Sequence, residues 1–249
     1  MARLKLMISS VVLNHLSLKE IKPTLDSLKF SDEILIIQDK QQPLNFKKLP
    51  AKIKLFHRSL STDFSAQRNF ALKKAGGDWV LFVDSDEIVS SQLAEEIKVV
   101  VQKDFSGYLI SRQDIFYSQP LKHGETGQTK LLRLARKEAG IFTRSVHENW
   151  QIRGRVGELN ASLSHHKKDL TTGFLERMRL YGPIDGRSLD AENKPFSLFR
   201  LLFNPLGKFF LNYIVRRGFL DGLLGIFHAY LMSVQSFTVR VFQKEARLA

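Results

Sequence analysis

Two aspartates, Asp84 and Asp86, directly follow the apolar run Trp79 to Val83, which has the length of a buried strand. Ligands of a parallel sheet bind beyond the carboxyl ends of its strands, so both carboxylates are expected at a ligand site. Carboxylate oxygens suit Mg²⁺ or Mn²⁺, and these ions bridge one or two carboxylates to substrate phosphates. The spacing therefore indicates a metal site that neutralises a diphosphate. Because a bare Asp-x-Asp is more often a solvated turn, the surrounding segment has to distinguish the two.

The elements around these aspartates alternate between strand and helix patterns. Short apolar runs predict strands, and apolar residues at helical spacing, followed by Gly76-Gly77 in one case, predict helices. This rhythm predicts an α/β fold with a mostly parallel sheet that helices cover on both faces. The expected strands are 6–13, 33–37, 53–57 and 79–83, and the expected helices are 18–28, 64–75 and a segment from Ser90 or Ser91 to Val101.

The second half of the chain changes character. Strands are expected at 107–112 and 130–135, separated by a polar loop, and the chain becomes aromatic, basic and helical from Pro195 onward. A polar break at 190–195 suggests a boundary there. We therefore predict a catalytic domain at 1–192, with halves 1–90 and 91–192, and a helical region at 193–249.

Composition limits the class of protein. The 249 residues contain 43% hydrophobic side chains and no cysteine, which excludes disulfides and thiolate sites and fits a reducing compartment. The net charge of +13 indicates an anionic partner. Lysines and arginines are spread along the chain, which favours phosphorylated small molecules or an anionic membrane surface over nucleic acid. The N-terminal apolar stretch is expected to be a strand instead of a signal peptide, and no uncharged run predicts a transmembrane helix.

The segment 63–97 reads DFSAQRNFALKKAGGDWVLFVDSDEIVSSQLAEEI. It resembles the core of the family 2 glycosyltransferases, and most closely the lipopolysaccharide core-biosynthesis enzymes of the WaaE type. Their pattern is an Ala-Gln-(Arg/Lys)-Asn-x-Ala helix, then Gly-Asp-Trp-(Val/Ile)-Leu, then Asp-x-Asp-Glu. Further matches follow in the same order at Lys122-His123-Gly124, Leu132-Arg133-Leu134, Val146-His147-Glu148 and Arg217 to Gly222.

The resemblance implies a GT-A fold and a role for each matched residue. Asp86 would ligate Mn²⁺ or Mg²⁺, and Asp84 would contact the ribose or the metal. The remaining donor-site residues would hold a nucleotide-sugar, with a UDP-sugar favoured, and they are Gln67, Arg68, Asn69 and Arg133. Arg68 would pair with a phosphate or with the two aspartates. Arg133 would hold a diphosphate or, as a strand residue, pair with an acidic neighbour. The acceptor implied is a glycan or a lipid-linked glycan of lipopolysaccharide or another cell-envelope polysaccharide.

Transfer with inversion is a single displacement, so it needs a base that deprotonates the acceptor hydroxyl. Glu148 is the candidate base and Glu87 is the alternative. His147 would serve as a metal ligand or a phosphate contact. His165 and His166 are adjacent on an expected strand, so they point to opposite faces and are interpreted as structural or surface residues.

Two segments depart from the family pattern. Members usually carry Thr-Lys-Asn-Glu after the first strand and Asp-Ser-Gly-Ser-x-Asp after the second. This chain has Leu13-Asn14-His15-Leu16-Ser17 and Gln38-Asp39-Lys40-Gln41-Gln42 in those places. Asp39 would replace the aspartate that holds the base and ribose, shifted by one residue. A catalytically inactive relative that only binds glycan or lipid is therefore kept as the alternative.

The segment 196–243 interleaves phenylalanine, leucine and isoleucine with arginine and lysine, and it is almost free of acidic residues. Basic amphipathic helices of this kind bind anionic lipid. Packing against the rest of the protein is the alternative use of such faces. We expect both, with the protein held peripherally at the inner face of the cytoplasmic membrane.

Overall fold

The chain divides into two units. The first contains residues 1–112 and 130–165, and the second contains residues 113–129 and 166–249. The computed structural model describes residues 6–39, 50–59, 63–127, 129–143, 148–167 and 169–248.

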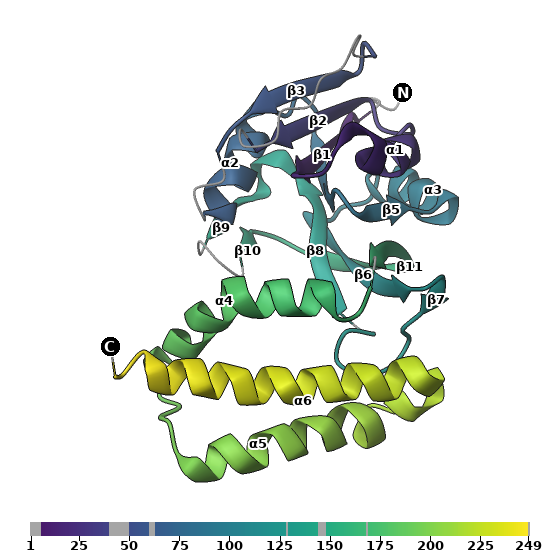
Figure 1. Ribbon diagram of the computed structural model, residues 1–249. Coiled ribbons are helices and arrows are strands. Elements are labelled where there is room, and N and C mark those ends of the chain that lie inside the picture. The colour runs from purple at the N-terminus through teal and green to yellow at the C-terminus, as the bar shows by residue number, and fades with distance from the viewer. Residues whose placement is uncertain are drawn as a thin grey trace. The chain divides into compact units, whose positions relative to one another are not determined.

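The first unit begins with a parallel sheet in the order β3-β2-β1-β4 (Figure 1). Its strands are the predicted apolar runs, and β2 is buried along its whole length. Three helices accompany them, and Ser90, one of the two predicted caps, caps α3 by accepting from the Leu93 amide at 3.1 Å. The elements are β1 (Ile8–Asn14), α1 (Leu18–Ser27), β2 (Glu33–Gln38), β3 (Ile53–His57), α2 (Phe64–Lys74), β4 (Trp79–Asp84) and α3 (Ser91–Val100).

The sheet continues from β4 with antiparallel strands. Strand β8 pairs antiparallel with β4, and the full order is β3-β2-β1-β4-β8-β6-β11-β5, with β7 on β6. The predicted α/β class is confirmed, and the sheet is mixed because only its first part is parallel. The further elements are β5 (Glu87–Val89), β6 (Gly107–Phe116), β7 (Gln119–Pro120), β8 (Thr129–Arg136), η1 (Lys137–Ala139), a β9 (Gly140–Thr143) and β10 (Asn149–Ile152) pair, and β11 (Val156–Lys167).

Alternating strand residues build two cores on the two faces of the parallel sheet. Trp79, Leu81 and Val83 of β4 pack with residues of α1 and α3, whereas Val80 and Phe82 pack with residues of α2. This follows from the two-residue period of a strand, which sends successive side chains to opposite faces. Helices on both faces therefore hold β4 rigidly, and Asp84 stands at its carboxyl end.

Gly77 lies where β4 approaches β1, and a side chain there would not fit. A Cβ atom would lie 2.6 Å from Ser9 Oγ and 2.8 Å from both Met7 O and Ser9 N. Since β1 is hydrogen-bonded on both sides, its backbone cannot move away cheaply. We expect Gly77→Ala to lower the free energy of unfolding by about 1–3 kcal/mol in urea titrations. Gly173→Ala is the control because a Cβ there meets no atom within 4 Å; equal stability of the two variants would contradict the prediction.

The second unit is mainly helical. It contains α4 (Thr172–Ala191), α5 (Leu198–Phe210), the π-helical turn η2 (Leu211–Val215), η3 (Gly218–Asp221) and α6 (Gly222–Glu245). The predicted polar break at 190–195 lies between α4 and α5, inside this unit. Helix α6 approaches α4 closely at Gly182 and Gly186, where Phe242 occupies the space of a missing side chain.

One helical stretch, Gly218–Glu245, has the length and the apolar composition needed to cross a membrane, and 22% of its most apolar window is buried inside the protein. The sequence pattern predicted no such helix because polar residues such as His228, Ser233 and Gln235 interrupt the uncharged run 222–239. Length and composition alone are weak grounds for a membrane span.

Two of the family-like motifs meet within the second unit. The His123 ring lies 2.8 Å from Asp221 Oδ1, and the His123 amide donates to Oδ2 of the same residue at 2.7 Å. The next turn of the loop is held by Asn212, which accepts from the Glu125 amide at 2.7 Å. These contacts fix the loop 121–127 to the turn between α5 and α6.

Candidate active site

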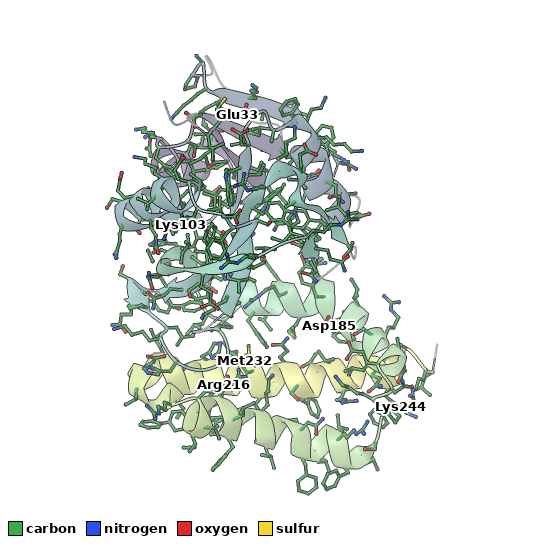
Figure 2. The ribbon with its side chains drawn as sticks, turned by 180° about the vertical axis from the view of Figure 1, so that it is seen from behind. Glu33, Lys103, Asp185, Arg216, Met232 and Lys244 are labelled. Atoms are coloured by element: carbon green, nitrogen blue, oxygen red, sulfur yellow. The ribbon has the colours of Figure 1, made fainter. Side chains whose placement is uncertain are left out.

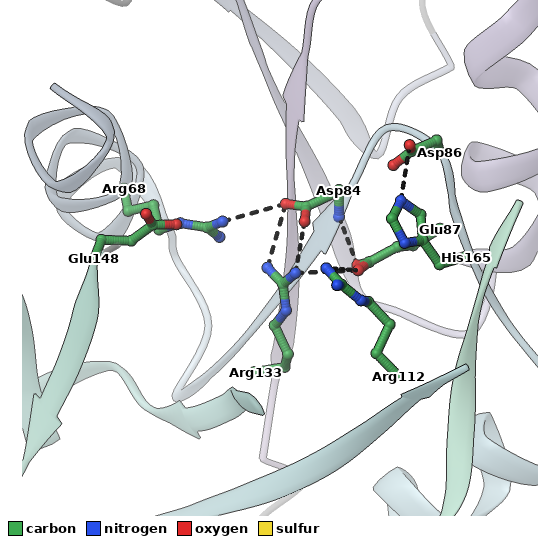
Figure 3. Close-up of polar contacts among 8 residues, drawn as sticks. All are labelled: Arg68, Asp84, Asp86, Glu87, Arg112, Arg133, Glu148 and His165. Carbon is green, nitrogen blue, oxygen red and sulfur yellow. Dashed lines mark hydrogen bonds and ion pairs between the residues drawn. The ribbon is translucent and has the colours of Figure 1, made fainter. Parts of the chain in front are cut away.

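The charged residues predicted to form the site converge within the first unit (Figure 3). Asp84 ends β4, Glu87 begins β5 and Arg133 lies on β8. Arg68 reaches them from α2, and Glu148 lies just before β10. Three carboxylates and two guanidinium groups thus share one corner of the sheet.

Asp84 is held by two arginines. Arg133 Nη2 donates to Asp84 Oδ2 at 2.5 Å, while Arg133 Nη1 and Arg68 Nη2 both donate to Oδ1 at 3.2 Å. Burial disfavours the charged carboxylate, but the two arginines outweigh it and hold the pKa of Asp84 well below its ordinary value. Asp84 is therefore an ionised anchor for these arginines.

Glu87 is completely buried and contacts both Arg133 and the backbone of Asp84. Its Oε2 accepts from the Asp84 amide at 2.9 Å, and its Oε1 accepts from Arg133 Nη2 at 3.1 Å. Burial raises the pKa of Glu87, and the nearby charge of Asp84 adds to this, while Arg133 opposes it. Both oxygens are occupied and the side chain is inaccessible to an acceptor, so its contacts suit a positioning role better than the role of a base.

Arg68 connects Asp84 to Glu148. Its Nε donates to Glu148 Oε1 at 2.8 Å, and its guanidinium lies over the rings of Phe82 and Phe142, 5.3 and 5.5 Å from their centroids. The Arg68 side chain is only 7% exposed, whereas that of Glu148 is 20% exposed. Within the described part of the chain, Glu148 Oε2 has no hydrogen-bond partner, so this oxygen is available to a substrate hydroxyl.

Asp86 lies apart from the arginines. His165 Nε2 is 2.9 Å from Asp86 Oδ2, and the Asp86 side chain is 36% exposed. No group of three His, Cys, Asp or Glu side chains among the described residues is arranged to hold a metal ion. One carboxylate is sufficient for Mg²⁺ when substrate phosphates and water supply the other ligands. A metal that binds together with a phosphorylated substrate would therefore need no more from the protein than one exposed carboxylate such as Asp86.

The other predicted donor-site residues mainly join elements. Asn69 donates to the Phe142 carbonyl at 2.8 Å and accepts from the Phe142 amide at 2.9 Å, which ties α2 to β9. Gln67 donates to the Arg58 carbonyl at 3.1 Å. Asp39 follows β2, and its amide donates to the Asn14 carbonyl at 3.1 Å. His147 and residues 40–42 lie outside the described residues.

A cavity of about 520 Å³ opens over this cluster. Its walls carry four cationic side chains, and Asp84 and Glu148 are the acidic residues among those that line it. Cations in excess at a concave site attract a diphosphate, and guanidinium groups bind phosphate through paired hydrogen bonds. The cationic residues are Arg68, Arg112, Lys130 and Arg133.

Two residues of this site did not emerge from the sequence. His165 was interpreted as structural or surface, but it is buried beside Asp86 because β11 pairs with β5 and places His165 opposite Glu87. Arg112, on β6, lies with Nη1 4.0 Å from Glu87 Oε1. In the sequence, only the alternation of side chains along these two strands could have indicated the two residues. Alternation shows which face of a strand a residue lies on, but not which residues that face contacts.

Comparison with known proteins identifies the family of the chain. The model of glycosyl transferase family 2 matches residues 9–157, and the chain belongs to this family. The family predicted from the motifs is thus confirmed.

The curated relatives are distant. The chain is 22% identical over 188 residues to an uncharacterised glycosyltransferase of Rickettsia typhi, covering 70% of this chain and 64% of that protein. A similar protein of Rickettsia conorii is also 22% identical, with 70% and 67% covered. Among solved structures, the mannosyltransferase PcManGT of Pyrobaculum calidifontis has a TM-score of 0.55 at 12% identity, covering 98% of this chain and 88% of that one. This last likeness shows the fold alone.

Proposed function

We propose that this protein is an inverting glycosyltransferase that moves a sugar from a nucleotide-sugar to a glycan or lipid-linked acceptor of the bacterial cell envelope. The observation that carries the proposal is the cationic cavity at the carboxyl end of β4, where Arg133 and Arg68 meet Asp84 beside the half-exposed Asp86. The family match supports the reaction class. The similarity to the WaaE-type sequences supports lipopolysaccharide synthesis as the setting.

The donor diphosphate would lie against the arginines. Arg68 and Arg133 are pre-positioned by Asp84, so little reorganisation is needed when negative charge grows on the leaving phosphate. Asp86 would hold Mn²⁺ or Mg²⁺ against the same phosphates, and the ion would neutralise the leaving group. PcManGT was solved in complex with GDP-mannose and Mn²⁺, which motivates testing both guanine and uracil nucleotides.

Glu148 would remove the proton of the acceptor hydroxyl. Arg68 Nε holds one of its oxygens at 2.8 Å, which orients the other toward the cavity. The hydroxyl oxygen then attacks the anomeric carbon, the bond to the diphosphate breaks, and the proton remains on Glu148. Glu87 would orient Arg133 and the backbone of Asp84 instead of accepting this proton.

Nucleotide binding provides the first test of this proposal. We expect one class among UDP, GDP and CMP nucleotides and their sugars to raise the melting temperature in the presence of Mn²⁺. At a hundredfold excess over Kd the native state gains about 2.7 kcal/mol, which corresponds to roughly 5–10 °C. Asp86→Ala should abolish the metal-dependent part of the shift.

Asp104→Ala is the control because this aspartate is exposed and distant in sequence from the site. It should retain the full shift. If no nucleotide shifts the melting temperature of the parent protein, the enzyme proposal fails. The inactive glycan- or lipid-binding relative would then be the better account.

A further inference from the structure

Helix α5 presents an apolar stripe to solvent. Its large hydrophobic side chains recur every three to four residues, so they lie on one face of the helix. The helix has no buried residue. The exposed fractions are 69% for Leu198, 67% for Phe199, 59% for Leu202, 51% for Phe203, 65% for Leu206 and 59% for Phe210.

Helix α5 packs against α6 through the flank beside this stripe. Ser233 of α6 donates to the Pro205 carbonyl at 2.8 Å, and the rings of Phe209 and Tyr230 lie 4.8 Å apart. A stripe of this length normally faces a core, because that is how an amphipathic helix gains stability. Here the stripe faces outward, and in Figure 2 ring-bearing side chains project from α5 on the side away from α6.

Helix α6 extends the exposed apolar surface along the neighbouring edge. Its exposed side chains also recur at helical spacing, and Tyr230 touches Phe209 of α5, so the two stripes adjoin. The members on α6 are Leu223, Phe227, Tyr230, Val234 and Phe237. We call the two stripes together the apolar face. Soluble monomers rarely expose so many adjacent large apolar groups without a binding partner.

Cations lie at both ends of this face. Residues 193–249 contain eight lysines and arginines but only Asp221 and Glu245 as acidic residues. Arg216 and Arg217 lie at the turn between α5 and α6, and Lys244 lies near the other end, as the labels of Arg216 and Lys244 show in Figure 2. An apolar surface with basic ends is complementary to an anionic bilayer, where acyl chains receive the apolar groups and headgroups receive the cations.

Neither helix is suited to spanning a membrane. Helix α5 has 13 residues, or about 20 Å at the helical rise, against a hydrocarbon thickness of about 30 Å. Helix α6 is long enough, but it carries buried polar groups that the second unit satisfies. Arg240 Nη1 donates to the Lys194 carbonyl at 2.9 Å, and Gln243 Nε2 donates to Asp190 Oδ1 at 2.5 Å. Within its uncharged stretch His228 is buried too, with Nε2 3.2 Å from Thr126 Oγ1, so insertion would leave a polar ring in hydrocarbon without this partner.

We infer that α5 lies in the plane of an anionic bilayer surface, with the apolar face of α5 and α6 inserted into the interface and α6 not crossing it. The inference deepens the proposed membrane association, and it does not require that the enzyme be active. An enzyme held in this way stays at the surface that carries a lipid-linked acceptor.

Co-sedimentation of the purified full chain with vesicles tests the inference. We expect binding to phosphatidylcholine vesicles that contain about 30% phosphatidylglycerol, which gives them a negative surface. Binding to vesicles of phosphatidylcholine alone should be weak. Added salt should weaken the binding. Phe203→Glu should reduce it by about tenfold to a hundredfold, because a buried phenylalanine contributes about 1.5–3 kcal/mol. Val99→Glu is the control, since Val99 is 61% exposed on α3, outside the apolar face.

Four further measurements keep the outcomes distinct. Circular dichroism and the nucleotide-induced melting shift should be unchanged in Phe203→Glu, so that lost binding is not lost folding and the donor site is assessed separately. Vesicle binding that Phe203→Glu leaves intact would overturn the inference. So would resistance of the bound protein to alkaline carbonate extraction, which indicates a span. A dimer in sedimentation velocity that Phe203→Glu dissociates would assign the face to a second copy of the chain instead.

Discussion

Glu148→Gln is expected to lower the turnover number by about 10²–10⁴-fold while leaving nucleotide binding nearly intact. The amide keeps an oxygen that accepts the hydrogen bond from Arg68 Nε, now 2.8 Å from Glu148 Oε1. It cannot accept a proton, so only the chemical step is affected. The assay uses the nucleotide-sugar that raises the melting temperature and measures its hydrolysis through the nucleoside diphosphate that is released. Water takes the place of the acceptor, whose identity is not needed for this measurement.

A pH profile separates a base from a residue that only shapes the cavity. The rate of the parent enzyme should fall as acid protonates the base, and this fall should be lost in Glu148→Gln. Glu95→Gln is a matched control because Glu95 pairs with Lys98 on the exposed side of α3. Full activity of Glu148→Gln would exclude this residue and return Glu87 to consideration, despite its complete burial.

Arg133→Met is expected to lower the free energy of unfolding more than Gly77→Ala does. Its guanidinium is 6% exposed and contacts both Asp84 and Glu87, so its removal leaves two carboxylates without their shared cation. Breaking a buried ion pair from one side costs about 3–5 kcal/mol, and the partial exposure of Asp84 favours the lower end. Urea unfolding at pH 7 measures the change. Lys130→Met is the control, because Lys130 forms an exposed pair with Glu158 and should cost less than about 1 kcal/mol.

The difference in the free energy of unfolding between the parent protein and Arg133→Met should become smaller as the pH falls from 7 to 5. With Arg133 present, the pKa of Asp84 lies below its ordinary value, so Asp84 stays ionised throughout this range. The pKa of Glu87 is already raised by burial. Without Arg133, the pKa of Asp84 rises above that of the unfolded chain and the pKa of Glu87 rises further. The folded variant then binds more protons than the unfolded one, and its stability increases with falling pH. Adding Glu87→Gln to Arg133→Met should recover part of the loss. A penalty that is independent of pH, or one that Glu87→Gln enlarges, would show that packing and not charge is the role of Arg133.

The sequence determined the features that depend on local pattern. The apolar run Trp79 to Val83 followed by Asp84 predicted the carboxyl end of a buried strand, and β4 ends at Asp84. The motif around Arg68 and Asn69 predicted a helix, and α2 covers it. The same motifs predicted the family. Each of these predictions uses residues within a few positions of one another, where periodicity and turn chemistry act directly.

The contacts of the site were decided by the tertiary structure. Arg68 and Glu148 are 80 residues apart, His165 and Asp86 are 79 apart, and Arg133 and Asp84 are 49 apart. The sequence suggested Arg68 as a partner of the two aspartates and a phosphate role for Arg133. It did not indicate that Arg133 would hold Asp84 on two oxygens or that His165 would lie beside Asp86. Those pairings follow from the antiparallel strands β8 and β11, whose register no local pattern specifies.

The apolar face shows the same division. Spacing alone predicted that residues 196–243 form amphipathic helices with basic residues among the aromatic ones, and both packing and lipid binding were consistent with that. The tertiary structure decided which face of α5 packs and which is exposed, because α5 packs through Pro205 and Phe209 and leaves Phe199 and Phe203 in contact with solvent. A periodic pattern specifies that a helix has an apolar side, but only the neighbouring elements determine how much of that side they can cover.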